Sequence, residues 1–333
     1  MRVFSRNIAA LLLTALGWMP QLSAAQTEPA AASEAAEWTS SHVQHIFGFP
    51  GAEPKENGTL TFTEHAIRFA GKSANSDVDR RSVIAVSAGN QRVELWGLKG
   101  QLLRMAIPNG GGLAAATVMH HRIDILTVEF VDRTGGYHGA VFFLPANEAD
   151  HALRSFSGTP AVQQRPSQEA CSGEAIRPQS VVVPAPIWDK ADVPVVYRAL
   201  VYEHLVDRLR KTEGVDRVYR DGESYVHQGC PDYSIQITIS AFKQGSQVRR
   251  AAMGPVGMFA GTTQMTFDET VSDASGGIFL REQVKATARG ESENTNVAGK
   301  VAKDLAKRYA AVAKNSRQIS TAEEMQGARL PPR

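Results

Sequence analysis

The chain has 333 residues, of which 43% are hydrophobic and 21% are charged, and its formal net charge is +2. This is the composition of an ordinary globular protein. A net charge so close to zero gives no electrostatic argument for nucleic-acid binding.

The first 25 residues have the pattern of a secretory signal peptide. Arg2 and Arg6 precede an apolar run at residues 8–16, and the small residues Ser23, Ala24 and Ala25 follow. The run is too short for a transmembrane helix, which needs about 20 apolar residues. No cysteine lies near the expected cleavage after Ala25, so a lipid-anchored lipoprotein is excluded. The sequence therefore predicts a periplasmic or secreted protein without a transmembrane segment.

About 300 residues remain after cleavage, which favours two domains. Residues 26–37 are rich in Ala, Glu and Ser and predict a flexible leader. Residues 38–158 contain seven segments with strand patterns, separated by turn residues, and then one short helix. The segments begin at His42, Gly58, His65, Ser82, Arg92, Ile123 and Ala140.

This first half resembles a pleckstrin-homology-like or GRAM-like domain. The resemblance rests on the order of seven strands followed by a helix, and on the phrase GTLTFTEHAIRF at residues 58–69. It implies a PH-like β-barrel with a C-terminal helix over residues 38–158.

Residues 159–186 are rich in Pro, Gln and Ser and predict a linker. Cys171 lies in this linker, and Cys230 lies in a Gly-Cys-Pro-Asp turn. An exported protein meets an oxidising compartment, so we expect these two cysteines to form a disulfide. Closing a loop of about 60 residues would stabilise the fold by on the order of 4 kcal/mol.

The second half, residues 187–316, predicts a helix, antiparallel strands and a second helix. In the first helix the apolar residues share one broad arc, and Asp192 is the expected N-cap. Its other side carries Glu203, His204, Asp207, Arg208 and Lys211. The last helix, residues 294–314, has a lysine face, and residues 317–333 predict a tail. The expected fold is an α+β sandwich of an antiparallel sheet with two helices.

This second half resembles a bacterial envelope domain of unknown function (DUF4410-like). The phrases that carry the resemblance are YR at residues 197–198, YEHL at 202–205, FKQGS at 242–246 and the glycine-rich stretch at 254–261. The resemblance covers residues 181–314. It implies a compartment and a fold, but no established activity.

Two carboxylates have a pattern that acid–base catalysis uses. Glu269 and Glu282 each fall on the otherwise apolar phase of a strand, at similar distances from the turn at Ser275. Cross-strand carboxylates in a buried setting have separated pKa values. A bulge or an open sheet face explains the same pattern without chemistry. Arg198 is a candidate partner for this polar cluster.

The sequence indicates no metal or cofactor site. The GKS at residues 71–73 lacks the earlier glycine of a phosphate-binding loop, because Ala66 stands there. The histidine pairs have no third ligand at a recognisable spacing. Two basic regions remain as candidate contacts for an anionic surface: the loop with Lys72, Arg80 and Arg81, and the lysine face of the last helix, which a solvated surface also explains.

The leading hypothesis is an exported, non-enzymatic binding or assembly module of a bacterial envelope, with an envelope protein or a lipid surface as partner. One alternative is a hydrolase-like envelope enzyme that uses Glu269 and Glu282. The other is a lipid-binding accessory protein that uses the basic loop at Lys72, Arg80 and Arg81.

Overall fold

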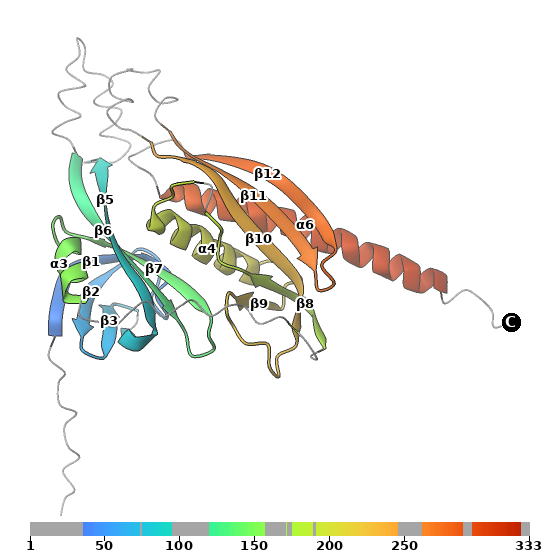
Figure 1. Ribbon diagram of the computed structural model, residues 1–333, viewed down its shortest axis with the longest axis horizontal. Coiled ribbons are helices and arrows are strands. Elements are labelled where there is room, and N and C mark those ends of the chain that lie inside the picture. The colour runs from blue at the N-terminus through green and yellow to red at the C-terminus, as the bar shows by residue number, and fades with distance from the viewer. Residues whose placement is uncertain are drawn as a thin grey trace, which may run out of the picture. The chain divides into compact units, whose positions relative to one another are not determined.

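Helix α4 (Val195–Arg210) packs against strands of two different β-sheets. The computed structural model (Figure 1) describes residues 36–73, 75–94, 120–156, 171, 175–188, 191–245, 262–288 and 295–327. The signal peptide predicted at residues 1–25, the glycine-rich stretch at 254–261 and most of the expected linker lie outside the described residues.

The first sheet contains seven antiparallel strands in the order β4-β3-β2-β1-β7-β6-β5. Their bounds are β1 Ala36–Phe47, β2 Glu56–Thr63, β3 Ala66–Gly71, β4 Asn75–Asp79, β5 Val83–Glu94, β6 His120–Val131 and β7 Tyr137–Leu144. Strand β5 joins two segments that the sequence predicted as separate strands, and β4 was not expected. Helix α3 (Ala149–Phe156) follows β7, and the Ala149 N–H donates to Asp124 of β6.

The expected PH-like barrel is wrong. Strands β4 and β5 stand at opposite ends of the sheet order, so the sheet is open over the described strands. Between them the chain forms the short 3-10 helix η1 (Arg80–Ser82). Arg80 bonds there to His65, Thr63 and Ser155. These hydrogen bonds hold the corner in place of the β4–β5 ladder that would close a barrel.

The second sheet has the order β12-β11-β10-β8-β9. Its strands are β8 Ile176–Val183, β9 Arg217–Arg220, β10 Cys230–Lys243, β11 Thr263–Asp273 and β12 Ile278–Ala288. The sheet is mixed, whereas the sequence predicted an antiparallel one, because β8 pairs in parallel with both β10 and β9.

The unexpected strand β8 explains this difference. It lies in the range that the sequence indicated as a linker, and Val181, Val182 and Val183 are all buried. Such a continuous apolar run is typical of a parallel strand. The chain passes from β8 through α4 to β9, and a crossover helix of this kind places the two strands in parallel.

The last helix, α6 (Asn296–Gly327), is longer than predicted and continues into the range expected as a tail. It packs on α4, β11 and β12 (Figure 1). Helix α4 begins after Pro194 without a side-chain cap, so Asp192 does not cap it as expected.

One hydrophobic core joins residues of both sheets and both long helices. It includes Ile125 and Val141 of the first sheet, Leu205 of α4, Ile237 of β10 and Leu305 of α6. A second core lies within the first sheet and α3. Residues 35–333 form one compact unit, and no helix in its described residues is long and apolar enough to cross a membrane.

Candidate functional site

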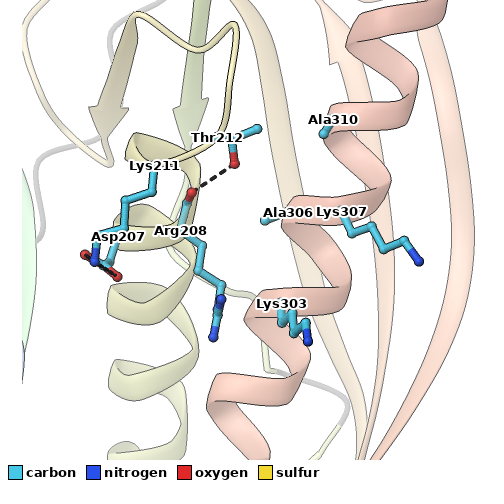
Figure 2. A pocket seen from close by; sticks show the side chains of 8 residues that line it. All are labelled: Asp207, Arg208, Lys211, Thr212, Lys303, Ala306, Lys307 and Ala310. Carbon is cyan, nitrogen blue, oxygen red and sulfur yellow. Dashed lines mark hydrogen bonds and ion pairs between the residues drawn. The ribbon is translucent and has the colours of Figure 1, made fainter.

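A cationic groove of about 400 Å³ lies between the C-terminal end of α4 and the middle of α6 (Figure 2). Its lining residues are Asp207, Arg208, Lys211, Thr212, Lys303, Ala306, Lys307 and Ala310. The four residues from α6 follow the i, i+3, i+4, i+7 spacing of one helix face. The short side chains of Ala306 and Ala310 leave space beside α6, and the longer side chains of Lys303 and Lys307 lie next to them.

The charges in the groove are unbalanced. Its one carboxylate, Asp207, already pairs with Lys211, whose Nζ is 2.8 Å away. This leaves Arg208, Lys303 and Lys307, none of which forms an ion pair with another described residue. The groove therefore presents a net positive surface to a ligand.

The end of α4 is well ordered by its own hydrogen bonds. The Thr212 hydroxyl donates to the Arg208 carbonyl at 2.9 Å, and the Lys211 N–H donates to the same carbonyl. These bonds satisfy a carbonyl that the helix end leaves without an intrahelical partner. They also fix the backbone from which the Arg208 side chain extends.

A second polar cluster lies at the junction of the two sheets and is buried. Arg220 of β9 donates to both carboxylate oxygens of Glu203 at 2.8 Å each, and Glu203 is only 2% exposed. Glu203 also accepts from the Gly139 N–H of β7, and Arg220 donates to the Tyr137 carbonyl. The pair thus connects α4, β9 and the first sheet.

The electrostatics of this junction follow from burial and pairing. Burial alone would raise the pKa of Glu203, but the Arg220 charge and its hydrogen bonds hold the pKa below its ordinary value. Beside the pair, His138 Nδ1 is 3.8 Å from Glu203 Oε1 and His138 Nε2 is 3.1 Å from Asp132 Oδ2. Each of these four side chains has at least one polar partner, although the buried Arg220 Nε has none, and this pairing indicates a structural role for the cluster.

The sequence did not predict this junction, because Glu203 falls on the polar side of its helix.

The carboxylates that the sequence did predict as candidates lie elsewhere, in the second sheet. Glu269 and Glu282 are direct cross-strand partners on β11 and β12. Glu269 is fully buried, and its two carboxylate oxygens have no hydrogen-bond partner. Glu282 is half exposed and pairs with Arg308 of α6.

Burial raises the pKa of Glu269 to about 7, and the Arg308 charge opposes part of this rise. Arg308 was not anticipated as the cation at this pair. The expected candidate, Arg198, lies with its guanidinium 3.8 Å from the ring centroid of Trp188. The three-residue polar cluster is therefore reduced to two carboxylates with an arginine from α6.

The three cations of the predicted basic loop have different environments in the structure. Arg80 is buried, pairs with Glu37 and lies 4.8 Å from the Phe156 ring centroid. Lys72 and Arg81 are exposed. Arg80 therefore stabilises the first sheet and is not available to an anionic surface.

Cys171 and Cys230 form a disulfide, with their Cα atoms 5.7 Å apart. Cys230 is the first residue of β10, and its N–H donates to the Ala175 carbonyl just before β8. The bridge therefore fixes Cys171 beside the start of two neighbouring parallel strands.

No protein-family model matches the chain, and no curated protein matches it. Among solved structures, the hypothetical protein CT253 from Chlamydia trachomatis matches 40% of this chain and 96% of its own length, with 9% identity and a TM-score of 0.31. The PelC dodecamer from Paraburkholderia phytofirmans matches 41% and 93%, with 16% identity and a TM-score of 0.28. The DUF330 protein XCC0632 from Xanthomonas campestris matches 46% and 95%, with 9% identity and a TM-score of 0.28.

These matches include bacterial proteins of unknown function, and similarity at this level carries no argument about activity. Membership of the DUF4410-like family, expected from the sequence, is not shown by any of them.

Proposed function

We propose that the protein is an exported, non-enzymatic binding module of a bacterial envelope, and that the groove between α4 and α6 is its binding surface. The observation that carries this proposal is the set of cations in the groove. Arg208, Lys303 and Lys307 share one concave surface, and the only carboxylate there is already paired with Lys211.

The position of the carboxylate pair supports binding over catalysis. General acid–base catalysis needs a carboxyl group within hydrogen-bond reach of a substrate. Glu269 is fully buried under α6, and it does not line the groove. The hydrolase alternative therefore has less support than a binding role.

The structure of the basic loop favours the groove over the loop as an anionic contact. A lipid-binding role for the first half would use Lys72, Arg80 and Arg81 together. Arg80 instead forms an ion pair with Glu37 and donates hydrogen bonds to backbone carbonyls. Two exposed cations remain there, against three in the groove that also share a defined concavity.

Export is supported by the signal-peptide pattern together with the disulfide. Disulfides persist in oxidising compartments such as the bacterial periplasm. Cell fractionation with N-terminal sequencing tests this part. We expect an exported chain that begins near Gln26, and an uncleaved chain in the cytosol would contradict it.

Binding is tested by affinity purification of the tagged protein from envelope extract, followed by mass spectrometry of lipids, small molecules and proteins. We expect a component that is retained reproducibly and released by high salt, because screening weakens exposed charge interactions. Turnover of an envelope substrate that Glu269→Gln abolishes would replace the binding proposal by the enzymatic one.

A further inference from the structure

We propose that the α4/α6 groove binds a ligand that carries at least two neighbouring anionic groups. This inference rests on the proposed binding function and names the class of ligand for the same site. It is carried by the spacing of the three unpaired cations and by the volume between the helices.

The cations are placed for two anionic groups instead of one. Lys303 and Lys307 are one helical turn apart on α6, which corresponds to about 6 Å along the axis. Arg208 extends from α4 into the space between the two helices (Figure 2). One anionic group can lie between Arg208 and Lys303, and a second beside Lys307, whose side chain extends from α6 on the side away from α4 in Figure 2.

The side-chain chemistry suits this division. A guanidinium is a planar fork that donates two parallel hydrogen bonds to a phosphate or carboxylate, whereas a lysine ammonium is a compact charge that accepts any orientation. The low walls at Ala306 and Ala310 leave room for the ligand between these groups. A volume of about 400 Å³ is within the range of small-molecule sites and exceeds what one simple anion needs.

The three groove cations differ from other described cations that have a carboxylate partner. The paired cations include Arg80 with Glu37, Arg122 with Asp124, Lys211 with Asp207, Arg217 with Glu223, Arg220 with Glu203 and Arg308 with Glu282. The groove instead gathers three cations without such a partner, and their mutual repulsion is relieved when an anion binds. Asp304, which is exposed on α6, does not line the groove.

Calorimetric titration of the purified protein with orthophosphate, tripolyphosphate and citrate at one fixed ionic strength tests the proposal. We expect tripolyphosphate or citrate to bind at least about tenfold more tightly than orthophosphate. The variant Arg208→Gln/Lys303→Gln/Lys307→Gln should lose about tenfold in affinity, because each exposed charge contact contributes modestly.

The matched control is Lys72→Gln/Arg81→Gln/Lys285→Gln, which removes three exposed cations outside the groove. It should bind like the wild type. An equal loss in this control would show that only net charge matters and would overturn the proposal. So would equal affinities for orthophosphate and the multivalent anions, or full binding by the groove variant.

Vesicles containing phosphatidylglycerol distinguish the source of the anionic groups. Sedimentation with vesicles that the groove variant loses assigns them to lipid headgroups, and binding of tripolyphosphate or citrate without sedimentation assigns them to a soluble ligand. Either result supports the groove. If the groove variant still retains the wild-type component from envelope extract, the ligand assignment fails while the binding function stands; if the wild type retains nothing, the binding function itself fails.

Discussion

Arg220 of β9 holds the carboxylate of Glu203 with two hydrogen bonds of 2.8 Å in a site closed to solvent. Glu203 uses a third interaction to hold the Gly139 N–H, which belongs to the other sheet. One ion pair thus connects three elements that are far apart in the sequence, and it fixes α4, the helix that forms one wall of the groove.

Glu203→Gln should destabilise the protein strongly. The substitution leaves the Arg220 charge buried without a counter-charge, and removing one partner of such a pair costs about 3–5 kcal/mol. Urea unfolding of the variant and the wild type measures this free energy. Asp207→Ala, which breaks the exposed pair with Lys211, is the control and should cost less than about 1 kcal/mol. Similar losses in the two variants would show that the buried pair does not stabilise the junction.

Gly139→Ala should also destabilise the junction, through close packing. A Cβ at Gly139 would lie 2.7 Å from the Ala199 Cβ of α4, closer than carbon atoms can approach. Relief requires α4 to move away from β7, and overpacking of this kind costs about 1–3 kcal/mol. Gly89→Ala on β5 is the matched control, because its Cβ would meet its nearest atom at 3.9 Å. Equal unfolding free energies for the two alanine variants would contradict the close approach of β7 and α4.

The junction also shows what the sequence cannot predict. A helical wheel assigned Glu203 to the polar side of its helix, because it divides residues into two classes and assumes one buried side. Here the first sheet covers this second side, through a contact between Gly139 and Glu203 that spans 64 residues. The charge that makes burial tolerable, Arg220, comes from a third element.

Contacts between residues that are close in the sequence could be predicted more readily. The cross-strand position of Glu269 and Glu282 depends on the turn between β11 and β12, and a short hairpin fixes its own register. Arg308 belongs to a separate helix, α6, so the local pattern around the two glutamates did not predict its contact with Glu282. For the same reason the lysines of α6 were visible as a basic face, whereas their opposition to Arg208 was not.

Glu269 should make stability fall as the pH rises. Its pKa is about 7 in the folded protein and 4.5 ordinarily, so between these values the folded state keeps a proton that the unfolded state has released. The stabilisation is therefore complete below about pH 4.5 and is lost as the pH rises through 7. The total change is on the order of 3 kcal/mol.

Urea unfolding between pH 5 and pH 8 measures this dependence. Glu269→Gln should lose it and should exceed the wild type in stability at pH 8, since an uncharged amide replaces a buried carboxylate. Glu64→Gln, at an exposed position, should keep the wild-type dependence. Parallel curves for the wild type and Glu269→Gln would mean that Glu269 is ionised or solvated throughout this range.

The disulfide should stabilise the crossover that carries α4. Cys171 and Cys230 are separated by 59 residues, and the segment between them contains β8, α4 and β9. Cross-linking restricts the unfolded chain, and a loop of this length corresponds to about 4 kcal/mol in the chain-entropy model. Cys230→Ser and Cys171→Ser should therefore lower the free energy of unfolding by similar amounts, and reducing agent should destabilise the wild type but neither variant.

Because β8 and β10 also pair through backbone hydrogen bonds, both variants should keep the β-sheet signal in circular dichroism. Thiol titration of the denatured, unreduced wild type should find no reactive cysteine. Two reactive thiols per chain, or a wild type whose stability reducing agent leaves unchanged, would show that the bridge does not hold the crossover.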